Sequence, residues 1–288
     1  MQIKKLLFVT TFEDIGFNAL LSLMDLQKAA LSHVVFLKVI EQKKMGVPVG
    51  ENKEIRLREI ANIRFTDWAE ELFQRRVEVG VCIVVGNLLQ QVLLAAREEA
   101  PDLIVVGLKK QGALDHFFSG SRGDEIAHRT KKPVLVYKHH MGNRRDTKKP
   151  FERPLLASDL SPGSQAAVSL LKGLKNVVQE VSVVHVATKK ELKATSPMDI
   201  QATRKTSLSQ LDKICEEFEM EGIHAKAHLY VGAVKSEIEK ASKECGATMI
   251  VIGASGKSIW YEKVFGNLNS YLSTKSSLPV LIVPAGFT

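Results

Sequence analysis

Two glycine-containing turns in the second half of the chain have the residue types and spacing of a phosphate-binding loop. The segment 253–256, Gly-Ala-Ser-Gly, follows a short apolar run, and after nine further residues Gly266 and Asn267 open a helical pattern. Glycines let the backbone approach phosphate oxygens without a Cβ in the way. A helix that begins at Gly266 would also offer free N–H groups and the positive end of its dipole to the anion. Asn267 can cap that helix or donate its side-chain amide. The spacing therefore predicts an anion site, although isolated glycines also serve simple turns.

A carboxylate lies at a second position where ligands bind. Asp159 follows the apolar run 155–157 after one residue, Ser158. Open parallel sheets bind ligands at the carboxyl ends of their strands, so Asp159 is a candidate contact. The alternative is a structural role as an N-cap or in an Asx turn.

The elements that must position these residues occur twice. Gly107 and Gly253 lie 146 residues apart, and so do Gly120 and Gly266. The same offset relates Gly86 to Gly232 and the segment 132–136 to 278–282. The earliest strands shift by only one or two residues, as short loop insertions would produce. The chain is therefore two copies of one unit, which we place at residues 1–140 and 151–288. A polar linker, 139–150, joins them.

Each copy alternates apolar runs with helical patterns. Continuous Val, Ile and Leu runs between helices indicate a parallel sheet covered on both faces, and thus a doubly wound, five-stranded α/β domain. Ser161 and Pro162 are expected to start the first helix of copy two. The predicted strands are 5–10, 34–40, 77–85, 103–107 and 134–137 in copy one, and 155–157, 181–187, 225–231, 249–253 and 280–283 in copy two. The clearest helices in copy one are expected at 54–73, 88–99 and 123–130.

Across nearly its whole length the sequence resembles the universal stress protein family. Nucleotide-binding members of that family carry GxxG, nine residues, and then Gly followed by Ser or Thr. Copy two matches this motif at Gly253, Gly256 and Gly266 and departs from it at Asn267. The resemblance implies an adenine-nucleotide-hydrolase-like, Rossmann-like fold, with dimers that meet at the last strand. It also implies nucleotide contacts at Asp159, Val186 and Leu268.

Copy one matches the family motif less well. Gly107, Gly120 and Ser121 keep the spacing, but Lys110 stands where the second glycine belongs. Thr11 replaces the aspartate, and Val39 takes the place of Val186. A lysine in this loop could hold phosphate electrostatically or fill the cleft. We therefore expect the ligand mainly in the second copy.

Composition excludes several other classes of protein. The chain has 288 residues, 45% of them hydrophobic, and a net charge of +8 from scattered lysines and arginines. Its three cysteines have no CxxC spacing, which argues against disulfide frameworks and thiolate zinc sites, and Cys82 is expected in the core. No metal ligands, catalytic residues or nucleic-acid platform are predicted. Since no apolar run is long enough to span a membrane, the protein is expected to be soluble and cytoplasmic.

Three functions remain open at this point. The first is a stress-response module that binds ATP or another adenine nucleotide, with or without Mg²⁺, and signals its bound state. The second is a slow ATPase or self-phosphorylating enzyme, for which no base or transition-state arginine is evident. The third is a ligand-free protein that dimerises or binds an unknown protein partner. A homodimer of the tandem chain is compatible with all three.

Overall fold

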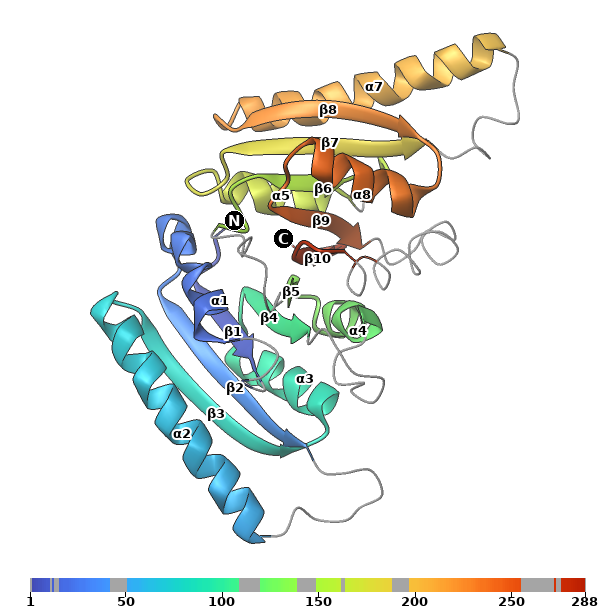
Figure 1. Cartoon of the computed structure of the whole chain (residues 1–288). Helices are drawn as coiled ribbons and strands as arrows, with labels where there is room; N and C mark the ends of the chain where they lie inside the picture. The colour runs from blue at the N-terminus through green and yellow to red at the C-terminus, as the bar shows by residue number, and fades with distance from the viewer. Residues whose placement is uncertain are drawn as a thin grey trace.

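The computed structural model describes residues 2–10, 12, 16–41, 51–108, 120–138, 149–161, 164–187, 197–254, 272 and 276–287 (Figure 1). The predicted strands are confirmed to within one or two residues at their ends. The first half contains β1 (Lys5–Val9), α1 (Phe17–Leu21), η1 (Met24–Ala29), β2 (His33–Glu41), α2 (Glu51–Gln74), β3 (Glu78–Gly86), α3 (Leu88–Glu99), β4 (Leu103–Leu108), α4 (Gly120–Thr130) and β5 (Val134–Lys138). The second half contains β6 (Pro154–Ala157), α5 (Gln165–Gly173), β7 (Glu180–Ala187), α7 (Pro197–Glu219), β8 (His224–Val231), α8 (Val234–Glu244), β9 (Met249–Ala254) and β10 (Val280–Pro284).

The described strands of both halves form one continuous sheet. Its order is β3-β2-β1-β4-β5-β10-β9-β6-β7-β8. Within each half the neighbouring strands run parallel, as the doubly wound pattern predicts. In each half the first strand lies at the centre, and the chain leaves it in both directions. This arrangement creates a crevice at the carboxyl end of that strand, where open α/β sheets bind ligands.

The two halves meet through the antiparallel pairing of β5 with β10. Leu135 lies opposite Leu281, and these two residues are counterparts in the repeat. Val134 pairs with Ile282, which is the counterpart of Val136, and Val136 pairs with Val280, which is the counterpart of Val134. This is the register of a two-fold axis through the Leu135–Leu281 pair. The pseudo-two-fold arrangement and its contact at the last strands, both predicted, are confirmed.

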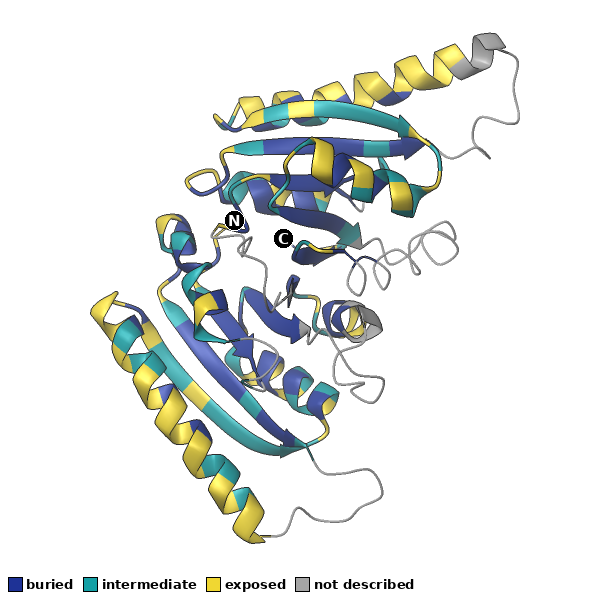
Figure 2. Cartoon of the chain, in the orientation of Figure 1, coloured by how far each residue is buried: buried dark blue, intermediate teal, exposed yellow. Residues whose placement is uncertain are grey.

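Helices cover both faces of this sheet. One buried cluster joins α1, η1, α2, α5 and α7 to one face, and a second cluster joins α3, α4 and α8 to the other. Both clusters contain residues of both halves, so each core face runs across the β5–β10 pair. Figure 2 shows the central strands as buried, whereas α2 and α7 expose one side along their length. The molecule is therefore a three-layer α/β/α structure.

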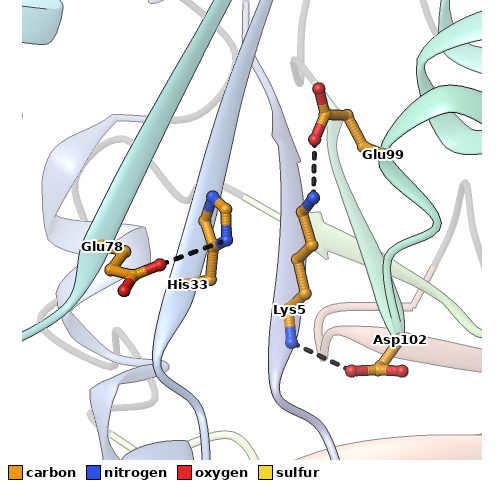
Figure 3. Close-up of polar contacts among 5 residues, drawn as sticks. All are labelled: Lys5, His33, Glu78, Glu99 and Asp102. Atoms are coloured by element: carbon orange, nitrogen blue, oxygen red, sulfur yellow. Dashed lines mark hydrogen bonds and ion pairs between the residues drawn. The ribbon is translucent and has the colours of Figure 1, made fainter.

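Polar contacts fix the order of strands at the amino end of the first half. The carboxylate of Asp102, just before β4, accepts hydrogen bonds from the backbone N–H groups of Lys4 (2.8 Å) and Lys5 (3.0 Å) at the start of β1. The Lys5 side chain in turn forms an ion pair of 2.6 Å with Glu99 at the end of α3 (Figure 3). These contacts seat β1 beside β4.

The second half repeats this device with a neutral side chain. Thr248 is the counterpart of Asp102, and its hydroxyl accepts a hydrogen bond of 2.9 Å from the N–H of Arg153 at the start of β6. The same hydroxyl donates to the carbonyl of Pro150 (2.7 Å). The contact is conserved in place between the halves although the residue type differs.

The cores beneath the longest helices differ between the halves. In the first half, Phe36 stacks on Phe65 of α2 with ring centroids 4.9 Å apart, and Trp68 packs edge-on against Phe36 at 5.4 Å. In the second half the counterparts of Phe65 and Trp68 are Leu211 and Ile214, both aliphatic. Because each core must be close-packed, the two copies reach the same architecture with different side-chain volumes.

Two sequence-based expectations are wrong in detail. Cys82 was expected in the core but is only half-buried, because β3 is an edge strand, and Cys215 on α7 is the buried cysteine. The first helix of copy two begins at Gln165 with Ser164, and not the expected Ser161, at its N-cap position, and Pro162 lies outside the described residues.

We predict that a side chain at Gly123 damages the junction of the two halves. A Cβ there would lie 2.7 Å from the Cγ2 atom of Val136 and 3.8 Å from the Cδ1 atom of Ile282, so α4 can approach β5 and β10 only without one. Gly123→Val should therefore lower the free energy of unfolding by about 1–3 kcal/mol, measured by denaturant titration. In the double variant with Val136→Ala the loss should be smaller than the sum of the single losses by about 1 kcal/mol. Additive losses would contradict this packing.

We also predict that the cysteines differ in reactivity. Burial raises the pKa of the Cys215 thiol to about 11, because the thiolate is the form that burial disfavours. At pH 8 only about one thiol in a thousand is then ionised, and the thiolate is the nucleophile. Iodoacetamide should therefore label Cys245, which is half-buried, well before Cys215, as measured by peptide mass spectrometry. Faster labelling of Cys215 in the folded chain would contradict the burial.

Candidate functional site

A turn with the same geometry follows the first strand of each half. In the second half the N–H of Ser158 donates to the carbonyl of Val184 (2.9 Å), and the N–H of Leu160 donates to the Ser158 hydroxyl (3.0 Å). Leu160 has a φ of 60°, in the left-handed region. Such a conformation is rare for a residue with a branched side chain and needs support from its surroundings, which this hydrogen bond supplies. The turn directs the chain sharply away from the end of β6.

The first half contains the counterpart of this turn. Thr10 takes the place of Ser158: its N–H donates to the carbonyl of Leu37 (3.1 Å), and its hydroxyl accepts from the N–H of Phe12 (2.8 Å). Phe12 has a φ of 70°, which matches the value at Leu160. The residue between the two anchors is Thr11 in the first half and Asp159 in the second. The backbone device is thus common to both halves, and the residue it presents differs.

Asp159 forms an Asx turn with one of its two carboxylate oxygens. Oδ1 accepts hydrogen bonds from the N–H of Ser161 (3.0 Å) and from the Ser161 hydroxyl (2.6 Å). This is the structural role that the sequence left open as an alternative. The other oxygen, Oδ2, has no hydrogen-bond partner among the residues that the structure describes. Asp159 is half-buried at the carboxyl end of β6, so the turn holds it in place and leaves one oxygen for a ligand.

The described residues after this turn lead into α5. The Ser161 hydroxyl donates to Asp159. Ser164 takes over the entry to the helix, with its own hydroxyl donating to the carbonyl of Ser161 (2.8 Å). Each of these serines is therefore used to shape the segment between β6 and α5.

The register of the sheet brings three predicted contact residues to one edge. Ala157, the last residue of β6, pairs with Val184 on one side and Ile252 on the other. Asp159 therefore lies between the ends of β7 and β9, where Val186 and Gly253 are found. Every second residue of β7 directs its backbone N–H and C=O groups toward β6, and Val184 is one of these residues. Val186 consequently directs its backbone groups toward the space beyond the end of β6.

His185, which is not among the predicted contacts, lies beside the turn after β6. Its Nδ1 atom lies 2.9 Å from the carbonyl oxygen of Ser158, which can only accept, so Nδ1–H is the donor. The side chain is half-buried and joins β7 to the turn that carries Asp159. A polar residue near the end of an otherwise apolar strand was the signal for this position.

The first half assembles a related edge. Val39 is buried near the end of β2 and Gly107 near the end of β4, on either side of the turn after β1. The helix α4 begins at Gly120, earlier than the predicted start at residue 123, so Gly120 and Ser121 occupy its first turn. The equivalent position in the repeat is Gly266.

Six predicted contacts lie outside the described residues. They are Thr11, Lys110, Gly256, Gly266, Asn267 and Leu268. The described residues therefore supply the strand ends around the predicted sites, together with the contact residues Asp159, Val186 and Gly253.

Other kinds of site find no support within the described ranges. No group of three or more His, Cys, Asp or Glu side chains there is arranged to hold a metal ion. None of the described helices combines the length and the apolar composition that crossing a membrane requires. A groove of about 470 Å³ lies between α2 and the amino-terminal part of β3, and thus not at the carboxyl edge that carries Asp159 or its counterpart.

Comparison with known proteins agrees with this geometry. The model of the universal stress protein family matches residues 2–138 and again residues 150–284. The universal stress protein MJ0577 of Methanocaldococcus jannaschii is 25% identical over 153 residues, which are 46% of this chain and 94% of that protein. The universal stress protein YxiE of Bacillus subtilis is 28% identical over 146 residues, 46% of this chain and 99% of its own length.

A solved structure extends the likeness to the whole chain. The crystal structure of a universal stress protein from Archaeoglobus fulgidus superposes with a TM-score of 0.74 at 21% identity, and covers 99% of this chain and 97% of that one. That likeness shows the fold, and the double match of the family model shows the ancestry of both halves. The chain therefore belongs to the universal stress protein family and contains two universal stress protein domains in tandem.

Proposed function

We propose that this chain binds an adenine nucleotide, ATP or AMP, at the carboxyl edge of β6, β7 and β9, and that it acts as a stress-response signalling module. The observation that carries the proposal is the turn at Asp159. One carboxylate oxygen is fixed by Ser161 at 3.0 and 2.6 Å, and the other has no partner among the described residues. A carboxylate fixed in this way is preorganised to accept hydrogen bonds from ribose hydroxyl groups or to meet a phosphate-bound Mg²⁺.

The neighbouring strands supply the other contacts. Val186 directs its backbone groups into the crevice beyond β6, where they can meet the edge of an adenine ring. Gly253 lies near the carboxyl end of β9 and has no Cβ, so its backbone can approach a ligand closely. Backbone groups and one carboxylate at the carboxyl ends of three adjacent strands suit a nucleoside better than a protein surface.

The remaining parts of the site come from the sequence motif. Gly256 and Gly266 allow backbone N–H groups to approach phosphate oxygens, and Asn267 can add a side-chain amide. Leu268 follows them in the place that the family motif gives to a contact residue. We assign these residues to the triphosphate side of the ligand.

The first half is proposed as the weaker site. It keeps the turn of Thr10 and Phe12 and the positions of Val39 and Gly107, but it has Thr11 in place of the carboxylate. Lys110 replaces a glycine of the motif, and Gly120 with Ser121 opens α4. A site without the carboxylate lacks a charge-assisted acceptor for the ribose or for a metal ion.

We predict that calorimetric titration of ATP with magnesium separates the two halves. Gly256→Val should weaken binding by at least about tenfold, because one or two charge-assisted hydrogen bonds at about 1.5–3 kcal/mol each are lost. Asp159→Asn should also weaken binding, by about tenfold, while the amide oxygen keeps the turn with Ser161. Lys110→Ala in the first half should have a much smaller effect.

The matched variants also define the contrary result. If Lys110→Ala abolishes binding and Gly256→Val binds as the unmodified chain does, the working site is in the first half. If Asp159→Asn and Gly256→Val both leave the affinity unchanged, the carboxyl edge of the second half is not the site.

We further predict that adenine nucleotide accompanies the purified protein. Native mass spectrometry should detect one ATP or AMP for most chains, and the complex should survive for hours without product. Steady conversion of ATP to ADP or transfer of phosphate to the chain would favour the slow enzyme. A ligand-free chain in stable association with another protein would favour the partner-binding function.

A further inference from the structure

The sheet has two outer edges, β3 in the first half and β8 in the second. The N–H of Glu78 donates to the carbonyl of Ser32 (2.8 Å), so Glu78 faces the neighbouring strand β2. Backbone groups of successive strand residues point to alternate sides. The outward-facing residues of β3 are therefore Val79, Val81, Ile83 and Val85.

The carboxyl-terminal part of the β3 edge is covered by side chains. Arg58 of α2 donates to the carbonyl of Ile83 (2.8 Å), and Gln91 of α3 donates weakly to the carbonyl of Val85 (3.4 Å). No described residue makes such a contact with the outward backbone groups of Val79 or Val81. An unpaired strand edge of this kind is a template for another strand.

The β8 edge is protected at the place where β3 is open. The N–H of Gly232 donates to Ala187, so Ala225 faces outward, and its N–H donates to the Glu219 carboxylate (2.9 Å). Ala225 is the counterpart of Val79, and Glu219 is the counterpart of Phe73. The next residue, Lys226, places a cation on this edge, paired with Glu180 at 2.7 Å. Charged side chains and capped backbone groups are the usual protection of sheet edges.

The open part of β3 is bordered by apolar side chains together with the polar residues Asn62, Glu70 and Glu78. The groove of about 470 Å³ beside it is lined by residues of α2 and β3 that include Phe65, Thr66, Ala69, Phe73, Val79 and Val81. Phe73 is 80% exposed, Ile63 64% and Val81 45%. Figure 2 shows β3 in the colours of intermediate and exposed residues, in contrast to the buried strands beside it. From Ile55 to Phe73, both exposed, this surface extends about 27 Å along α2.

We propose that β3 pairs antiparallel with β3 of a second copy of this chain, about a two-fold axis at Gly80. In this register Val79 faces Val81 of the other copy, so the open backbone groups on both sides hydrogen-bond to one another. The backbone carbonyls of Ile83 and Val85, which accept hydrogen bonds from Arg58 and Gln91, take no part in this pairing. The exposed flank of α2 packs against its equivalent over the same face of the sheet.

A second copy fits this surface better than a short peptide does. The open backbone stretch is only as long as Val79–Val81, whereas the surface of α2 beside it exposes Ile63 and Phe73. A two-fold axis at Gly80 brings the carboxyl-terminal half of α2, which contains both residues, beside the same half of the second copy. The chain already joins two sheet edges in this way at β5 and β10, with α4 packed across the join.

The protection of β8 determines that such an assembly is closed. Pairing β3 with β3 uses the same surface twice and stops at two copies, whereas pairing β3 with β8 would continue into an open fibre. The Glu219 cap and Lys226 oppose that second mode. One open and one protected edge therefore produce a dimer.

Light scattering after size-exclusion chromatography of the full chain tests the proposal. At about 10 µM the unmodified chain should elute as a dimer. Val81→Lys, on the open edge, and Phe73→Glu, which installs the cap that Glu219 provides on β8, should each raise the dissociation constant of the dimer by at least about tenfold. Both positions are exposed, so the monomer should keep its circular dichroism spectrum and its unfolding midpoint.

The matched control is Ala227→Lys, the counterpart of Val81 on the protected edge. It should leave the dimer intact. A monomeric unmodified chain, a dimer that survives both Val81→Lys and Phe73→Glu, or equal disruption by Ala227→Lys would each overturn the proposal. Loss of nucleotide binding in the Asp159 or Gly256 variants should leave the dimer intact. The proposed nucleotide site lies at the carboxyl ends of strands in the second half, whereas the proposed dimer surface is the outer strand β3 of the first half.

Discussion

Backbone hydrogen bonds between β5 and β10 join the two halves of this protein, and the other long-range features depend on them. Without that pairing each half would end in a bare strand of Val, Leu and Ile residues. With it, both core faces continue from one half into the other. Contacts outside the sheet support the same junction: Lys149 lies 3.4 Å from Asp25, and the amide of Asn176 donates to the carbonyl of Lys28 (3.1 Å). The Lys28 and Lys149 ammonium groups lower the pKa of Asp25, consistent with an ionised carboxylate at the junction.

The two halves share a backbone plan but have diverged in what they present. The turn after the first strand has the same hydrogen bonds and a positive φ in both, but only the second half places a carboxylate in it. At the outer edges the difference is reversed, since the second half has the capped strand and the first half the open one. Ligand recognition and association with a second chain are thus proposed for opposite halves.

Much of this fold could be predicted from the sequence because its signals are local. Apolar runs fix the strands, and the 146-residue offset fixes the repeat, so the contact between the last strands of the two halves followed from the resemblance. The exposure of Cys82 could not be read in this way, because EVGVCIVVG has the composition of a buried strand although it lies at an edge. Strand order, which decides that, depends on contacts between distant segments such as Asp102 with Lys4.

The candidate site was predictable to a similar degree. Asp159 and Gly253 were identified by their places after strands, whereas Ser161, the expected N-cap, donates its hydroxyl to Asp159, and Ser164 takes the N-cap position. His185 was not among the predicted contacts, since its contact with Ser158 crosses between strands. Hydrogen bonds that link residues far apart in the sequence leave little trace in local patterns.

The covalent link between the copies changes how a substitution in the β5–β10 interface affects the stability of the molecule. In a dimer of separate identical chains, every substitution at such an interface occurs twice, once on each side of the axis, and its cost is doubled. In one chain the same substitution occurs once, and the tether holds the partner at an effective concentration of about millimolar. A weakened junction therefore still forms within the molecule. Residues away from the junction also differ between the copies, as Phe65 and Leu211 do, because a substitution in one copy is not repeated in the other.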